Sequence, residues 1–480
     1  MPTFLCGRDD RTGDFMGSMM RNVVKALVLG AVSFAPSVAW SESLADALIA
    51  AYRNSHLLEQ NQAVLRAADE DVATAVGSLL PVVSFVSRVG RVDTNYVDSR
   101  SIYRDGFSTS GSSSLQASYS LLDFGRGKAT VALKNELVLA SQAALVGVEQ
   151  QVMFDAVQAY VNVALQADLV ATQEANVNLV TQDLQATQDR FDVGEVTKTD
   201  VSLAQAQLAS AKAQLAAAQG NYTVAKERYN AAIGHYPDHI AALPHTKVAV
   251  ASLDEARAIA LRTHPAVAQS SHQAKAADLG VELAKAQMQP SVGLSGSVSE
   301  AYTTDGLTST VTSLGLELDQ TIYAGGQLSS GLRKAIAQQG QARAAQLQVG
   351  VNVTEAVGSA WSNILVANAS IAATQEQVVA AQAAYDGVKQ EAALGSRTTL
   401  DVLNAQQDLL SAQASHLQAQ ANLSVSQYGL LAAMGLLTAD QLKLGIPTFD
   451  PSAYLNAVKN APATSSRGAK LDKILKTLGK

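Results

Sequence analysis

Residues 201–229, VSLAQAQLASAKAQLAAAQGNYTVAKERY, carry the repeat that decides the fold. Apolar or small residues recur there at alternating steps of three and four, at Val201, Ala204, Leu208, Ala211, Leu215, Ala218, Tyr222, Ala225 and Tyr229. This is the spacing of a coiled coil, in which one face of each helix meets a partner helix. Because alanine fills about half of these positions, we expect a helix that packs closely against neighbours on both sides in a curved wall.

The whole pattern returns in the second half of the chain. Residues 402–430 keep the same heptad phase, although the polar side chain of His416 stands at one seam position. Short motifs around the heptads also repeat at nearly the same offset, in the pairs Gly194 and Gly395, Asp200 and Asp401, and Pro81 and Pro290. Such a repeat indicates two copies of one structural unit. We assign residues 40–234 to the first copy, 252–446 to the second, and 235–251 to a linker between them.

Proline is missing from two long segments, 82–236 and 291–446. Since a proline inside a helix costs about 3 kcal/mol, these segments can hold unusually long helices. Over residues 128–193 a continuous helix would reach roughly 100 Å, at about 1.5 Å per residue. Each half therefore predicts a helix, a β-hairpin, a long helix and a second helix, with the first helix at 44–79 and its counterpart at 253–288.

Both β-hairpins, expected at 82–124 and 291–323, alternate apolar with polar residues or glycine. The apolar members include Leu115, Ala117, Tyr119 and Leu121 in the first hairpin, and Leu314, Leu316 and Leu318 in the second. A period of two predicts strands with one apolar and one polar face. Such a sheet is either half-buried in a soluble protein or part of a transmembrane barrel with lipid outside and water inside.

The N-terminus has the organisation of a secretory signal peptide. Basic residues precede the apolar run 26–35, and small residues follow it at 37–39. We assign residues 1–39 to this signal, whose start is over-long because Met19 or Met20 would open one of ordinary length. The mature chain has no cysteine, and we expect no later transmembrane helix of about 20 apolar residues. A membrane location then requires β-strands.

Four strands per chain cannot close a barrel. Open edges in lipid would leave backbone groups unpaired, at a cost of several kcal/mol each. If the strands lie in a membrane, several copies of the chain must share one barrel, in a number that the residues leave open.

The composition argues against several other classes of protein. Charged residues make up 16% of the chain, and the net charge of -7 gives no basic surface for nucleic acid. The chain has no phosphate-binding loop, serine-nucleophile elbow or mature cysteine, so we expect no enzyme, no cofactor and no metal centre. His235, His239 and His245 gather in the linker, but the prolines beside them break any helix on which two histidines could share a metal.

The C-terminal tail, residues 447–480, contains several lysines towards its end. We expect this tail to be partly disordered and solvated.

These features together resemble the TolC family of outer-membrane efflux proteins over residues 43–446. Besides the repeat, the resemblance rests on the tip segments 191–194 and 394–404 and on the strand-to-helix turns 122–125 and 322–326. It implies an α+β membrane protein with a long antiparallel α-helical coiled-coil barrel and four transmembrane β-strands per chain. Three copies would complete a twelve-stranded β-barrel in a homotrimer.

The resemblance also implies a function in export. The protein would be an outer-membrane duct with porin-like conduction, and its helical tunnel would lie in the periplasm. A periplasmic adaptor and an inner-membrane transporter of the RND or ABC type would dock at the far end and supply the energy. The cargo would be drugs in multidrug efflux or proteins in type I secretion, and no residue distinguishes the two. The alternative is a periplasmic coiled-coil scaffold or adaptor, against which the two alternating β-hairpins count.

The family's periplasmic gate carries over to this sequence in part. Its arginine falls on Arg397 and the acidic partner in the neighbouring coil falls on Asp200. The family's gate tyrosine falls on Ala392, so that contact is missing. The adaptor-docking tips fall on Gly194 and Gly395.

The pore constriction also departs from the family pattern. Of the family's two aspartates, one falls on Asp401 and the other on Asn404, which leaves one ring of carboxylates that favours cations weakly. Asp200 and Asp401 also stand at equivalent helix N-termini, where a carboxylate gains about 0.3–1 kcal/mol from capping and from the helix dipole. Ordinary capping is therefore the alternative to a gate role for both.

Overall fold

The computed structural model describes residues 41–97, 103–241, 250–303 and 308–459, together with Lys470 and Lys473. The predicted signal peptide, His245 and most of the C-terminal tail lie outside these described residues. Residues 42–480 group into one compact unit, which holds every element named below.

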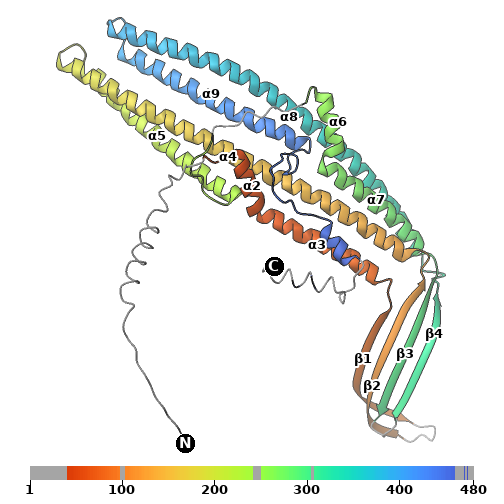
Figure 1. Cartoon of the computed structure of the whole chain (residues 1–480). Helices are drawn as coiled ribbons and strands as arrows, with labels where there is room; N and C mark the ends of the chain where they lie inside the picture. The colour runs from red at the N-terminus through yellow and green to blue at the C-terminus, as the bar shows by residue number, and fades with distance from the viewer. Residues whose placement is uncertain are drawn as a thin grey trace, which may run out of the picture. The chain divides into compact units, whose positions relative to one another are not determined.

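The two halves of this unit contain the same series of elements (Figure 1). The first half holds α2 (Leu44–Asn54), α3 (His56–Gly77), β1 (Val82–Val97), β2 (Tyr103–Leu122), α4 (Arg126–Asp192) and α5 (Lys198–Ile233). The second half holds α6 (Leu253–Thr263), α7 (Pro265–Ala286), β3 (Ser291–Thr303), β4 (Thr308–Asp319), α8 (Gln327–Ala393) and α9 (Thr399–Ala433). A short helix, α10 (Ala453–Val458), follows.

The sequence predicts one helix over residues 44–79, but the structure has two, α2 and α3. The chain is extended at Ser55, whose Oγ accepts a 3.2 Å hydrogen bond from the backbone N–H of Leu58 and so caps α3. The second half breaks in the same way at His264, because Pro265 lacks an amide hydrogen and suits the first position of a new helix. The single-helix prediction is wrong in both halves, and Pro265 is the sequence signal that marks the second break.

Helices α4 and α8 each contain 67 residues and therefore extend for about 100 Å. Each turns back through a tight loop into an antiparallel partner, α5 or α9, at the end opposite the β-sheet (Figure 1). The pairs are named hairpin 1 (residues 126–233) and hairpin 2 (residues 327–433). The long helices predicted from the missing prolines are confirmed.

One of the described helices, α4, is long and apolar enough to cross a membrane, with a mean hydropathy of 1.3 over its most apolar window. This differs from the expectation that no helix after the signal peptide meets that criterion. One such helix is weak evidence of a membrane span, and α4 contacts α3, α5, α7 and α9. We therefore assign α4 to the helical part of the chain, where it packs against these four helices.

Helix α9 packs on two sides, as its small seam residues predict. The heptad residue Leu430 is buried in a core that also contains Val353 and Val357 of α8. On another stripe of α9, the Nε2 of Gln406 donates a 2.8 Å hydrogen bond to Oδ1 of Asn176 in α4. Helix α9 therefore holds hairpin 2 together and also joins it to hairpin 1.

The end of hairpin 2 is fixed to the break between α6 and α7. The Oγ1 of Thr263 donates a 2.6 Å hydrogen bond to the carbonyl oxygen of Met434. Gly435 follows with a φ of +77°, and a Cβ there would lie 2.6 Å from the Cα of His264. Only glycine allows this left-handed turn and this close approach of two backbones.

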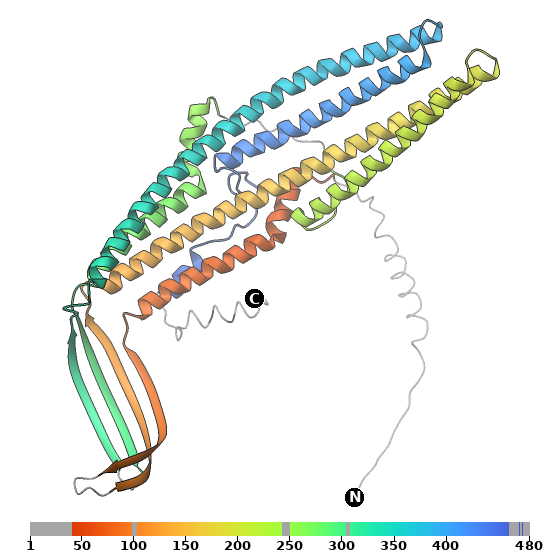
Figure 2. The same cartoon turned by 180° about the vertical axis from the view of Figure 1, so that it is seen from behind.

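The chain that follows α9 packs on the first half and ends in α10 against α3 (Figure 2). The hydroxyl of Tyr52 accepts a 3.2 Å hydrogen bond from the backbone N–H of Phe449. The carboxylate of Glu149, whose pKa is raised by burial, accepts a 2.8 Å bond from the N–H of Ala439. These contacts give residues 447–459, the start of the predicted tail, a defined position.

Asp69 in α3 is a buried carboxylate without a partner. It is 0% exposed, and neither of its carboxylate oxygens has a hydrogen-bond partner among the described residues. Burial raises its pKa from 3.8 to about 6. The repeat-equivalent Asp278 instead accepts a 2.9 Å hydrogen bond from Gln339 and lies 3.0 Å from a guanidinium nitrogen of Arg343.

Replacing Asp69 with asparagine is expected to raise the unfolding temperature at neutral pH. The carboxyl ionises near pH 3.8 in the unfolded chain but only near 6 in the folded one, so stability is lost as the pH rises through this window. A shift of this size costs about 3 kcal/mol at neutral pH, and an uncharged asparagine recovers part of it. Thermal unfolding in detergent at neutral pH and near pH 4 measures the gain, which should vanish in acid.

Asp278→Asn is the matched control for this experiment. It is expected to lower the unfolding temperature at neutral pH, because Arg343 would lose its charged partner. An Asp69→Asn protein that unfolds earlier than the wild type at neutral pH would contradict the assignment of an unpaired buried charge.

Candidate channel wall and tip gate

The four strands form one antiparallel sheet in the order β1-β2-β3-β4, and one of its faces is apolar. Phe85 lies beside Leu115, which lies beside Val298, and Leu314 lies beside Gly296. Leu314 is 80% exposed, and its apolar neighbours along β4 are similarly exposed. Because this apolar face is exposed in the described chain, the half-buried soluble sheet is the weaker of the two alternatives.

The opposite face of the sheet is dominated by serine hydroxyls. The register places on this face Ser84, Ser112, Ser114, Ser118, Ser295, Ser297, Ser299, Ser309 and Ser313. The Oγ atoms of Ser297 and Ser313 lie 2.8 Å apart, within hydrogen-bond distance. One apolar and one hydroxyl-lined face is the arrangement of a barrel wall between lipid and a water-filled interior.

The sheet is open at both edges, because β1 and β4 each pair with one strand only within the described chain. Unpaired backbone groups at such edges are too costly to leave in lipid. The wall is therefore incomplete in one copy of the chain.

At the other end of the helices, both hairpin tips turn on a glycine. Gly194 has a φ of +82° and Gly395 a φ of +79°, a conformation that glycine adopts without strain. A Cβ would meet nothing within 4 Å at either position, so the glycines serve the turn and not a close contact. The residues beside them are apolar and exposed, with Val193 at 73% and Leu394 at 86%.

Both predicted tip aspartates cap helices. Asp200 accepts hydrogen bonds from the backbone N–H of Thr197 at 2.9 Å and from its hydroxyl at 2.7 Å, which completes a capping box at the start of α5. Asp401 does the same with Thr398 at the start of α9. These bonds lower the pKa of both carboxyls, so both are charged at neutral pH. The capping alternative is therefore present in the structure.

Arg397 bonds within its own hairpin. Its Nε donates a 2.8 Å hydrogen bond to Glu391, which raises the pKa of the guanidinium, and Asp401 adds a smaller attraction. The hydrogen bonds and ion pairs of the described residues do not join Arg397 to Asp200. Asp200 does face hairpin 2, since a side-chain hydrogen bond from Thr399 also lowers the pKa of its carboxyl.

Two further residues that no sequence motif marks form ion pairs near this tip. Glu391 lies six positions before Arg397 and forms an ion pair with it. The two residues are close in the sequence, but they belong to no recognised motif. Lys389 forms an ion pair with Asp183 of α4 at 3.4 Å, and these two residues are too far apart in the chain for spacing to reveal the contact. Asn404, the second predicted constriction position, is exposed one turn after Asp401.

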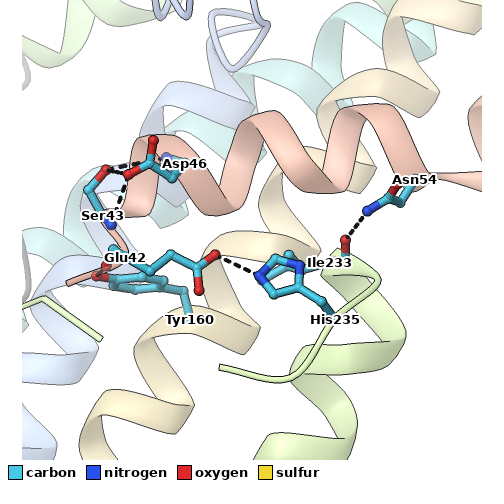
Figure 3. A network of polar contacts seen from close by, with 7 residues as sticks. All are labelled: Glu42, Ser43, Asp46, Asn54, Tyr160, Ile233 and His235. Carbon is cyan, nitrogen blue, oxygen red and sulfur yellow. Dashed lines mark hydrogen bonds and ion pairs between the residues drawn. The ribbon is translucent and has the colours of Figure 1, made fainter. Parts of the chain in front are cut away.

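One of the linker histidines, His235, has a structural partner (Figure 3). His235 Nε2 lies 3.0 Å from a carboxylate oxygen of Glu42, and Tyr160 donates a 3.0 Å hydrogen bond to the carbonyl oxygen of Glu42. Close by, the side chain of Asn54 donates a 2.9 Å bond to the carbonyl oxygen of Ile233 (Figure 3). No group of three metal-ligating side chains occurs in the part of the chain that the structure describes.

A sheet with one lipid-compatible face and open edges, joined to helical hairpins about 100 Å long, defines a channel-forming protein of the outer membrane. The family model for outer membrane efflux proteins matches residues 48–235 and 257–436. The chain belongs to the outer membrane efflux protein family. It is an efflux channel of the outer membrane, and its helical hairpins form the periplasmic tunnel.

Individual relatives agree with this family. The chain is 34% identical over 441 residues to the outer membrane efflux protein BepC of Brucella suis biovar 1 (strain 1330), covering 91% of this chain and 95% of BepC. It is 25% identical over 461 residues to the outer membrane protein TolC of Escherichia coli (strain K12), covering 90% and 91%. The crystal structure of the Campylobacter jejuni CmeC outer membrane channel matches with a TM-score of 0.72 at 16% identity, over 87% of this chain and 89% of that one.

Proposed function

We propose that three copies of this chain form one duct, in which their sheets join edge to edge into a twelve-stranded barrel. The observation that carries this proposal is the four-stranded sheet with an uncovered apolar face and two unpaired edges. Joining β4 of one copy to β1 of the next would pair the backbone N–H and C=O groups of every edge strand, because a closed barrel has no unpaired edge. The mass of the detergent-solubilised protein, measured by light scattering, tests the copy number.

The duct conducts passively, and its energy comes from an inner-membrane transporter to which a periplasmic adaptor connects it. The hydroxyl-lined face of the sheet supports passive conduction, because it offers weak and unselective contacts. The exposed Val193 and Leu394 support docking of the adaptor, because they offer apolar contacts beside Gly194 and Gly395. The duct itself catalyses nothing. Its cargo is small toxic molecules or secreted proteins, a choice that belongs to the transporter.

The tip forms the periplasmic gate of the duct. The Nε–H of Arg397 donates to Glu391. A guanidinium has five N–H donors, so the terminal N–H groups of Arg397 can donate to an acidic group of a neighbouring coil. Asp200 faces hairpin 2 and is charged at neutral pH, which makes it the acidic partner that we assign. A ring of Asp401 carboxylates, with Asn404 one turn further along, gives the constriction a modest preference for cations.

Replacing Arg397 with serine is expected to enlarge the single-channel conductance of the purified protein in a planar bilayer. Losing an exposed ion pair shifts the balance between closed and open tips by roughly 2- to 5-fold per chain, and by roughly 10- to 100-fold when three chains act together. Arg190→Ser is the matched control, because Arg190 makes the same kind of bond within hairpin 1, at 3.2 Å to Glu195. If the wild-type and Arg397→Ser proteins conduct equally well, Arg397 stabilises only its own hairpin and has no role in the gate. An inserted wild-type protein that does not conduct would contradict the duct itself.

A further inference from the structure

The two hairpins of one chain meet along a seam that is loosely filled near the tip. A cavity of about 580 Å³ lies between α4, α8 and α9, lined among others by Asn176, Tyr385 and Gln406. Apolar packing is interrupted there, and polar pairs at the edges of the cavity connect the two hairpins. Gln406 and Asn176 form one such pair, bonded at 2.8 Å.

A second polar cluster lies on the tip side of that cavity. The Nζ of Lys389 in α8 lies 3.4 Å from Oδ1 of Asp183 in α4 and donates a 3.2 Å hydrogen bond to the hydroxyl of Tyr385. Tyr385 is only 5% exposed, and its ring centroid is 5.4 Å from the same Nζ. The pKa of Lys389 is raised by these two partners although burial acts to lower it, so the amine is charged.

Lys389 and Asp183 form the ion pair that joins hairpin 1 to hairpin 2 within the described residues. The other tip ion pairs, Arg190 with Glu195 and Arg397 with Glu391, stay inside one hairpin. Any movement that separates the hairpins near the tip must therefore break the Lys389–Asp183 pair, whereas it can leave the other pairs intact.

The cluster is also specific to one copy of the repeat. The positions in α4 that correspond to Tyr385 and Lys389 hold Leu184, which has no hydroxyl, and Gln188, which has no positive charge. The seam between hairpins of one chain therefore differs chemically from a seam in which the roles of the two repeats are exchanged.

We propose that Asp183, Lys389 and Tyr385 form a tie that holds the two hairpins of each chain together and sets how easily the tip opens. The tie rests on the proposed function, since it assumes that the tips separate to open the duct. The positive amine of Lys389 pairs with the negative carboxylate of Asp183 across the seam, and the hydroxyl of the buried Tyr385 orients the amine. They are positioning residues and need not contact the cargo.

Conductance of the purified protein in planar bilayers tests the tie. Lys389→Gln and Asp183→Asn are each expected to raise the time-averaged conductance. Loss of one partly exposed ion pair changes an equilibrium by roughly 2- to 5-fold, so three ties acting together give roughly 10- to 100-fold. Lys389→Arg, which keeps the charge, and the reversed pair Asp183→Lys with Lys389→Glu should both return the conductance towards the wild-type value.

Lys226→Gln is the matched control. Lys226 also lies over a tyrosine one turn away, 4.7 Å from the ring centroid of Tyr222, but this pair belongs to α5 alone. Its loss is expected to leave the conductance unchanged. Equal conductance for the wild type, Lys389→Gln and Asp183→Asn would overturn the tie while leaving the duct in place. A conductance rise that the reversed pair does not correct would also overturn it. If the inserted wild type carries no current, the proposed function fails and the tie fails with it.

Discussion

Replacing Leu314 with arginine is expected to remove the protein from the outer membrane. Leu314 lies opposite Gly296, near the middle of the β3–β4 pair, and it is 80% exposed on the apolar face of the sheet. An arginine on the lipid face of a barrel costs about 2–4 kcal/mol at the middle of the bilayer. Because a trimer carries three copies of the change, the total penalty is comparable to the stability of a whole domain. Fractionation of cell envelopes should show that most of the variant is lost from the outer membrane.

Ser313→Arg is the control for this prediction, because Ser313 is adjacent in β4 but lies on the hydroxyl-lined face beside Ser297. An arginine there can extend into water, so insertion is expected at wild-type levels. If Leu314→Arg and Ser313→Arg inserted equally well, the apolar face would not contact lipid and the barrel assignment would be wrong.

Replacing Gly435 with alanine is expected to cause a large loss of stability in the helical part. The backbone there has a φ of +77°, which an alanine adopts only with strain. The added Cβ would lie 2.6 Å from the Cα of His264 and 2.8 Å from the carbonyl oxygen of Thr263, so one of the two backbones must move. The combined cost is about 3–5 kcal/mol, and the midpoint of thermal unfolding in detergent should fall clearly.

Gly445→Ala separates the two contributions to this cost. Gly445 has a similar φ of +68°, but a Cβ there would meet nothing within 4 Å. Its replacement should therefore cost only the backbone strain, about 1–2 kcal/mol. Equal losses of stability in the two variants would show that the backbone near Thr263 and His264 moves aside at no free-energy cost. The close approach at Gly435 would then not contribute to stability.

The repeated series of elements is predictable from the sequence because each element is encoded by neighbouring residues. The heptads of α5 and α9, the alternation in the strands and the long proline-free segments all report local backbone geometry. The same holds for the capping roles of Asp200 and Asp401, since each forms a reciprocal capping box with a threonine three positions earlier. The two helix breaks, before α3 and before α7, were not predicted, although Pro265 is a local signal for the second break.

The sequence by itself therefore determined the order of the strands and long helices, the length of the long helices and the two faces of the sheet, because these follow from periods of two, three and four residues and from the absence of proline. Only the tertiary structure decided which polar groups meet. In the structure Arg397 pairs with Glu391, and Lys389 pairs with Asp183 across the hairpins. Asp69 has no hydrogen-bond partner among the described residues, whereas its counterpart Asp278 pairs with Arg343. Such pairings depend on how helices distant in sequence are rotated against one another, and a side-chain bond of about 3 Å is made or lost by shifts that no local pattern records.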